Sequence, residues 1–284
     1  MVKIPPFSRQ NVHTLNSSLL SLMRIRPLQM GGRSMALAKQ ATNIVSPAEE
    51  HLNSVDRGHP VRLPIASLIL GGLSCIGMLA SIWLIFFYTP IDALQGVTQR
   101  IFYFHVPTAW TGMLGFVVMT VAGIVYLIKP DERLDWIARA SGEVGAVFLT
   151  FLLITGSLWG KPIWGAWWVW DPKLTAALIL WFMFIGYLML RSYMGRTSES
   201  ARVGAVWSIV GVIDVPIIYF SVLWWRGQHP GPQITSDGGL PPAAVLTLMV
   251  SLATFTLLYC FLMVLVYQLQ RLQTQAQRLH AIVE

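Results

Sequence analysis

Six long apolar stretches decide what this chain can fold into. Each has about 17–26 residues, and an α-helix of about 20 residues crosses the hydrocarbon core of a bilayer. Lipid offers no hydrogen-bond partner to a bare backbone, so we expect each stretch to be helical. The sequence therefore predicts an all-α, polytopic membrane protein with six transmembrane helices. The stretches are residues 65–88, 108–128, 141–159, 174–190, 204–225 and 242–267.

The composition agrees with a membrane protein and excludes several other classes. Hydrophobic residues make up 55% of the 284 residues and charged residues 12%, whereas soluble domains carry about 25% charged residues. An ordinary soluble enzyme, a disordered chain and a coiled coil are therefore excluded. The two cysteines, Cys75 and Cys260, lie inside apolar stretches and belong to no C-x-x-C-H motif, so the chain is not itself a c-type cytochrome.

The distribution of Lys and Arg predicts the orientation, because cytoplasmic segments are enriched in these residues. If the N-terminus is cytoplasmic, the cytoplasmic segments carry sixteen Lys and Arg residues and the opposite loops carry four. We therefore expect both termini in the cytoplasm and the loops 89–107, 160–173 and 226–241 on the outer face. The net charge of +7 mostly reflects this bias, so we expect the lipid bilayer, and no nucleic acid, as a partner.

The N-terminal region differs from the rest of the chain. Residues 1–62 contain eight Lys and Arg residues and no acidic residue before Glu49. We expect a basic, disordered cytoplasmic arm; a mitochondrial transit peptide and an over-extended gene start, with the true beginning near Met35, are the alternatives. A six-helix membrane domain over 63–270 and a cytoplasmic tail over 271–284 complete the predicted organisation.

The segment 159–175 is unusually rich in tryptophan, with five Trp within twelve residues. Pro162, Gly165 and Pro172 argue against one continuous helix through it, so we expect an outer loop. A membrane-interface belt would explain one or two Trp at a helix end, but not five in one loop. We therefore predict a folded platform that suits a large, flat, apolar ligand with a polar edge. The platform residues are Trp159, Trp164, Trp167, Trp168, Trp170 and Asp171.

Asp171 closes the tryptophan segment and stands directly before Pro172. Asp is a preferred N-cap residue, and Pro is favoured at the first position of a helix. We therefore expect Asp171 to cap the helix that follows and to set the angle at which the loop enters it.

Two of the six histidines, His105 and His229, are expected on the same outer face as the tryptophan loop. His105 stands just before the second apolar stretch and His229 just after the fifth. Two neutral imidazoles on opposite sides of a flat macrocycle would supply axial ligands, so the expected metal is a haem iron. Basic residues could meet the haem propionates, although snorkelling toward lipid head groups is the alternative for each. These residues are Arg100, Lys161, Lys173 and Arg226.

Asp214 is an acid in the middle of the fifth apolar stretch. An unpaired acid at that depth costs at least about 2.5–3.5 kcal/mol on insertion scales. We therefore expect a neutral acid, or hydrogen bonds to backbone groups that Pro216 leaves free. Asp214 is a candidate for function or for packing.

Three segments of the sequence resemble one family. They are Tyr103-Phe-His-Val-Pro107, the segment Trp164-Gly-Ala-Trp-Trp-Val-Trp-Asp171, and Val215-Pro-Ile-Ile-Tyr-Phe-Ser-Val-Leu-Trp-Trp225 leading to His229. They are similar to the haem exporter protein C family, also called cytochrome c biogenesis protein C, within the WWD-domain haem-handling superfamily. The resemblance covers about residues 65–267, and the tryptophan segment is its most specific part.

The resemblance implies a haem-binding protein of cytochrome c maturation that is not an enzyme. Such a protein holds haem b, a transported ligand, at the outer face through the WWD loop and the positions of His105 and His229. It delivers the haem to a membrane-anchored haem chaperone and works beside an ABC-type ATPase, the membrane subunit of that ATPase and a small single-span subunit. The expected location is a bacterial inner membrane, or alternatively the mitochondrial inner membrane. Lys173 stands where relatives often carry Arg.

Two other classes of function stay open on the sequence. A b-type haem electron-transfer subunit would place its ligand histidines within spans, and the predicted spans contain no histidine. A small-molecule permease would line a path through the membrane with polar residues, and only Asp214 qualifies. The chain has no phosphate-binding loop of the Gly-x-x-x-x-Gly-Lys-Ser/Thr type, so it does not hydrolyse ATP by itself.

Overall fold

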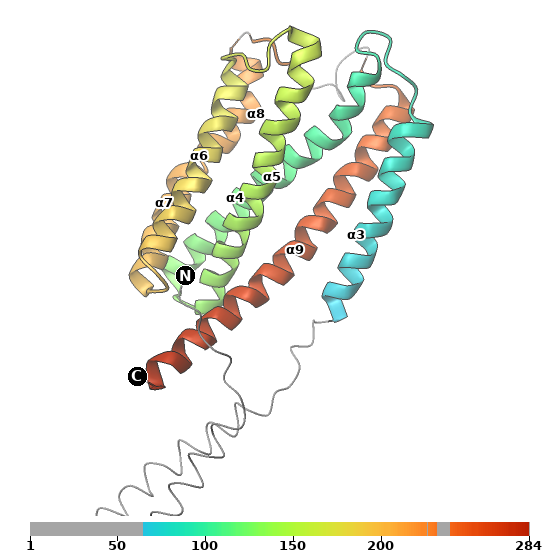
Figure 1. The fold of residues 1–284 in the computed structure, drawn as a ribbon. Helices are drawn as coiled ribbons and strands as arrows, with labels where there is room; N and C mark the ends of the chain where they lie inside the picture. Colours follow the sequence, from blue (N-terminus) through green and yellow to red (C-terminus); the bar gives the residue numbers. More distant parts are fainter. Residues whose placement is uncertain (1–64, 226, 232–238, 284) are drawn as a thin grey trace, which may run out of the picture. The chain divides into compact units, whose positions relative to one another are not determined.

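The computed structural model describes residues 65–225, 227–231 and 239–283; the expected arm at 1–62 lies outside this part of the chain. The described residues form helices joined by short connections (Figure 1). In chain order the elements are α3 (Ile65–Trp83), the π-helix η1 (Leu84–Tyr88), the 3₁₀ helix η2 (Val97–Ile101), α4 (Phe102–Ile128), α5 (Glu132–Trp164), α6 (Pro172–Tyr193), α7 (Ser198–Gly211), α8 (Asp214–Trp224) and α9 (Pro242–Val283).

The prediction of six spans is confirmed. Six helical segments of the described chain are long and apolar enough to cross a membrane. Most are longer than the sequence predicted, because hydropathy marks only the part in contact with hydrocarbon, whereas a helix can continue through polar residues beyond it. The segments are Ile65–Tyr88, Val97–Ile128, Glu132–Trp164, Pro172–Tyr193, Ser198–Trp224 and Pro242–Ala281.

Two predicted boundaries near the candidate site are wrong. His105 lies inside α4 and not before it, because this helix begins at Phe102. The tryptophan loop spans 165–171 and not 159–175, because α5 continues through Pro162 to Trp164. Pro162 stands in the last turn, where its ring removes one backbone hydrogen bond without ending the helix. The helix ends at Gly165, whose φ of 76° is left-handed.

The helices pack in two groups on either side of α4 and α5, which form a central antiparallel pair (Figure 1). On one side α9 packs against α5 and carries α3. On the other side α6 packs against α5, and α7 packs against α4 and α6. The core between α4 and α6 contains Phe116 and Phe184, whose rings meet edge to face at 4.8 Å. For the site, we call the end formed by residues 89–96, 165–171, 225 and 227–231 the tryptophan end.

The fifth span is broken near its middle. α7 ends at Gly211 and α8 begins at Asp214. Pro216 has no N–H to donate to the carbonyl of Val212, and its ring would clash with that carbonyl in a continuous helix. The Val212 carbonyl instead accepts a 3.1 Å hydrogen bond from the amide of Val215. The break leaves α8 packed chiefly against α6.

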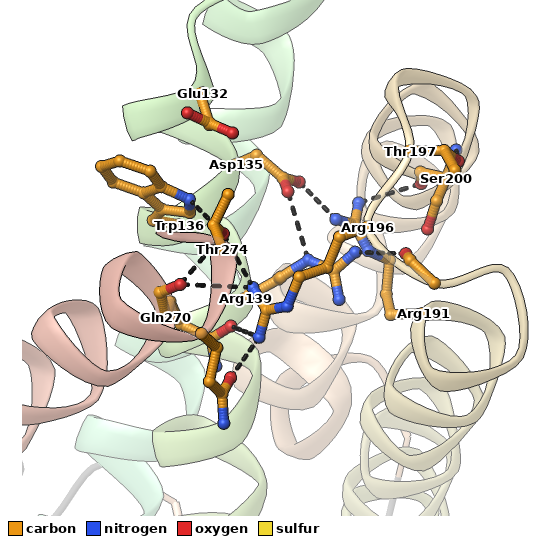
Figure 2. A network of polar contacts seen from close by, with 12 residues as sticks. Glu132, Asp135, Trp136, Arg139, Arg191, Arg196, Thr197, Ser200, Gln270 and Thr274 are labelled. Carbon is orange, nitrogen blue, oxygen red and sulfur yellow. Dashed lines mark hydrogen bonds and ion pairs between the residues drawn. The ribbon is translucent and has the colours of Figure 1, made fainter. Parts of the chain in front are cut away.

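A network of arginines links three helices at the end opposite the tryptophan end (Figure 2). The carboxylate of Asp135 on α5 pairs with Arg139, at 3.1 Å, and with Arg191 on α6. Both arginine side chains are buried. Arg196, in the α6–α7 connection, donates 2.7 Å from its Nη2 to Oε1 of Gln270 on α9. The network therefore fixes α6 to α5, and α9 to the connection that follows α6, at this end.

Candidate functional site

A large apolar cavity lies beneath the tryptophan end, between α4, α5, α6 and α8. Its volume is about 780 Å³, within the range of small-molecule sites. A second, smaller cavity of about 70 Å³ adjoins it. Four residues line both cavities: His105, Gly156, Leu174 and His229. The structure therefore brings the two predicted histidines to one space, although 124 positions of the sequence separate them.

The imidazole of His105 is held by a hydroxyl of α5. Its Nδ1 lies 3.1 Å from Oγ1 of Thr155. That hydroxyl already donates to the carbonyl of Phe151, at 2.7 Å. Since a hydroxyl has one hydrogen to donate, Nδ1 of His105 is the donor in the contact with Thr155. The proton of the neutral ring is then on Nδ1, which leaves the Nε2 lone pair free.

Two further α5 residues fix the position of the His105 ring. A Cβ added at Gly156 would lie 3.1 Å from Cε1 of His105, so the absence of a side chain there gives the ring its space. The indole of Trp159 meets the ring edge to face, with centroids 5.6 Å apart. Trp159 is itself oriented by a 3.0 Å hydrogen bond from Nε1 to Oε1 of Gln95.

Asp171 connects the tryptophan loop to the segment that carries His229. Its carboxylate is buried, and Oδ1 accepts a 2.9 Å hydrogen bond from the amide of Lys173, which confirms the predicted N-cap of α6. Oδ2 accepts from the amides of Gln228, at 2.7 Å, and His229, at 3.3 Å. One carboxylate therefore fixes the start of α6 and the backbone of the His229 segment together.

The approach of the two segments requires a glycine at position 227. A Cβ added there would lie 2.1 Å from Oδ2 of Asp171, far inside van der Waals contact. Any other residue would therefore push the His229 segment away from Asp171.

The imidazole of His229 is neutral and its Nδ1 is also engaged. Nδ1 lies 3.0 Å from the carbonyl oxygen of Pro230, which can only accept, so Nδ1 carries the proton and Nε2 is free. Burial lowers the pKa of His229 to about 4, and the charge of Lys173 acts in the same direction. Both histidines therefore present the same unprotonated atom, Nε2.

The predicted basic residues do not act as one group. Lys173 lines the large cavity. Lys161 donates to the carbonyl of Gly165, at 2.9 Å, and Arg100 lies over the ring of Phe86; neither lines the large or the small cavity. Arg226 lies outside the described residues.

The predicted platform is divided. The indole of Trp168 lines the large cavity, and those of Trp159 and Trp164 line the small one. Trp167 and Trp170 are 58% and 77% exposed and line neither cavity. The indoles therefore form part of the cavity wall and part of the surface above it, and not one continuous shelf.

Asp214 stands apart from the cavities. It is the first residue of α8, at the break in the fifth span, and its neighbours Val215 and Pro216 line the large cavity while it does not. Its Oδ2 is buried without a hydrogen-bond partner in the described part of the chain. The carbonyl that Pro216 leaves free, that of Val212, accepts from the amide of Val215, and Oδ2 of Asp214 does not bond to it.

Sequence reasoning missed four residues that hold the histidines: Thr155, Gly156, Gly227 and Gln228. Thr155 and Gly156 lie inside an apolar stretch, where small and hydroxyl residues are common, so no signal distinguishes them. The sequence indicates a role for Gly227 only weakly, through its place two residues before the candidate ligand His229. Gln228 contributes only its backbone amide, which no sequence pattern reveals.

The fold and the site together define a class: a helical membrane protein of six spans whose apolar cavity is lined by two imidazoles with free Nε2 atoms. The chain belongs to the family described as Heme exporter protein C, whose model matches residues 62–282. This confirms the family that the sequence resembled. Membership makes the chain a multi-pass, haem-handling component of an inner membrane and not an enzyme.

Bacterial and mitochondrial relatives are both similar to this chain. The Heme exporter protein C of Bradyrhizobium diazoefficiens is 40% identical over 172 residues, which cover 60% of this chain and 65% of that protein. The protein of the same name in Haemophilus influenzae is 35% identical over 214 residues, 75% of this chain and 84% of its own length. A putative cytochrome c biosynthesis ccmC-like mitochondrial protein of Arabidopsis thaliana is 33% identical over 204 residues, 70% of this chain and 76% of its own.

Proposed function

We propose that this protein binds haem b as cargo at the outer face of an inner membrane and delivers it to a membrane-anchored haem chaperone for cytochrome c maturation. The observation that carries the proposal is the convergence of His105 and His229 on one apolar cavity, each with Nδ1 engaged and Nε2 free. Imidazole is a common axial ligand of haem iron, and an apolar cavity suits the porphyrin. The names of the relatives support haem as the ligand.

The residues that line the cavity contact different parts of the haem. His105 and His229 bind the iron through Nε2, and Trp168 offers an aromatic wall. Lys173 meets a propionate as a point charge, without the two-pronged geometry of an arginine. The exposed Trp167 and Trp170 form the surface over which the chaperone docks, since both lie outside the cavity. Arg100 and Lys161 have other contacts and are weaker candidates for propionate binding.

The orientation and the partners are also part of the proposal. The bias of Lys and Arg favours cytoplasmic termini, which would place the tryptophan end outside. An ABC-type ATPase, its membrane subunit and a small single-span subunit complete the assembly, because this chain has no nucleotide-binding loop of its own. Accessibility labelling of single cysteines placed in 165–171 and in 194–197 tests the orientation. Labelling of 165–171 from the cytoplasmic side alone would contradict the proposal.

The central experiment is the spectrum of the purified full-length protein from haem-replete cells. We expect a b-type, low-spin spectrum in the wild type and loss of low-spin ligation in His105→Ala and in His229→Ala. A matched control is His280→Ala. His280 stands in the last turn of α9 and lines neither cavity, so this variant should leave the spectrum unchanged. Unchanged haem content and ligation in both site variants would refute the assignment of the ligands.

A b-type electron-transfer subunit is the second candidate, because one observation now favours it. His105 lies inside α4, so the sequence argument that no span contains a histidine is wrong. His229 nevertheless lies in a connection between helices. Rapid, reversible reduction of the bound haem by a quinol would support the second candidate, and haem that is not reduced by quinol but transfers to an acceptor protein would support the first.

A further inference from the structure

The side chain of Thr155 has no role in the proposed site except through His105. It lies on α5, one turn before Trp159, and lines neither cavity. Its hydroxyl donates toward the carbonyls of Phe151, at 2.7 Å, and Leu152, at 3.1 Å. Its remaining capacity is to accept, and the group that it meets is Nδ1 of His105, at 3.1 Å.

From this geometry we infer that Thr155 is a positioning residue that holds His105 as its Nδ1–H tautomer and so directs the basic Nε2 atom into the cavity. The inference rests on the proposed function, in which Nε2 binds the haem iron. A hydrogen bond from the second nitrogen of a ligating histidine fixes the ring and raises its basicity, and loss of such a partner costs about 10–100-fold in metal affinity.

The helical backbone makes this arrangement rigid. The hydroxyl of Thr155 is anchored to carbonyls of its own helix, so its lone pair points in a fixed direction. Gly156, the next residue, leaves the space that the imidazole fills. His229 has no comparable support, since its Nδ1 contacts only the carbonyl of the next residue, Pro230, in a connection between helices. Thr155 therefore acts on one of the two ligands.

The test compares Thr155→Val with Thr155→Ser in the full-length protein. Val has nearly the shape of Thr but cannot accept a hydrogen bond, whereas Ser keeps the hydroxyl. For Thr155→Val we expect haem affinity at least about 10-fold weaker and a more positive reduction potential, because a less basic imidazole stabilises ferric iron less. For Thr155→Ser we expect values near those of the wild type. A Val variant equal to the wild type, or a Ser variant impaired as much as Val, would overturn the inference.

Two further measurements keep the inference testable whatever Thr155→Val does to folding. The ¹⁵N spectrum of histidine-labelled, haem-free wild type, with His105 assigned by its absence in His105→Ala, reports the tautomer directly. We expect Nδ1–H, and an Nε2–H tautomer would overturn the inference. His105→Ala distinguishes failure of the proposed function from failure of the inference on Thr155. If the haem spectrum of His105→Ala is unchanged, the proposed function fails. If that spectrum changes but Thr155→Val binds haem as the wild type does, only the role of Thr155 is refuted.

Discussion

Replacement of Asp171 by Ala should weaken haem binding more than it weakens the fold. The carboxylate has two structural functions: Oδ1 caps α6 and Oδ2 holds the backbone at Gln228 and His229. Loss of an N-cap costs about 1 kcal/mol. Loss of a hydrogen bond to a charged group costs about 1.5–3 kcal/mol, and the 2.7 Å contact with Gln228 is of that kind.

The second loss acts on the ligand His229 and not on the helix. If about 2 kcal/mol of the free energy that holds the His229 segment is lost, haem affinity falls by roughly 30-fold. A second variant, Asp171→Ser, separates the two functions. Serine is a good N-cap residue, so it should still cap α6. Its shorter side chain cannot also reach Gln228. We therefore expect Asp171→Ser to lose haem affinity with little loss of stability.

The assay is a titration of haem into the purified haem-free protein, followed by the Soret band, with thermal unfolding measured in parallel. Asp131→Ala is the matched control, since Asp131 caps α5 at the other end of the bundle through a 2.8 Å bond to the amide of Arg133. It should lose a similar stability and no haem affinity. The reasoning is refuted if Asp171→Ala binds haem as tightly as Asp131→Ala does.

Three other predictions concern the charged and titrating groups. Asp135→Ala leaves two buried arginines without their carboxylate and should lower the free energy of unfolding by about 3–5 kcal/mol, whereas Glu132→Gln, which breaks an exposed pair with Arg278, should lower it by about 1 kcal/mol or less. Unfolding midpoints in detergent compare the two variants, and equal losses would contradict the argument from burial. Folding lowers the pKa of His229 from 6.5 to about 4, so between pH 4 and pH 6.5 the unfolded chain binds more protons than the folded protein. The haem-free protein should therefore lose stability as the pH falls from 6.5 to 4, and His229→Gln should lose less in the same melting experiment; an equal loss would be evidence against a neutral His229. Asp214→Asn removes the cost of an unpartnered intramembrane acid, so it should leave haem affinity unchanged and not lower the unfolding midpoint; weaker haem binding would instead assign Asp214 to the site.

Much of the architecture follows from the order of residues alone. The free energy of transferring an apolar stretch into lipid is summed along the chain, so the six spans could be predicted from consecutive residues. The N-cap at Asp171 could also be predicted, because a cap and its helix are neighbours in sequence. His105 and His229 lie at the same end of the bundle because four spans separate them, and an even number of crossings returns the chain to the end where it started.

Tertiary structure decided what the polar groups of the site contact. Thr155 is 50 residues from His105, and Gln228 is 57 residues from the carboxylate that holds it. The division of the tryptophans between cavity wall and exposed surface depends on where α5 ends, which Gly165 decides through a left-handed turn and not through hydropathy. Hydrogen bonds act over about 3 Å and need a defined direction. Such contacts depend on helix positions that no local pattern of residues specifies, whereas partition into the bilayer needs neither distance nor direction between residues.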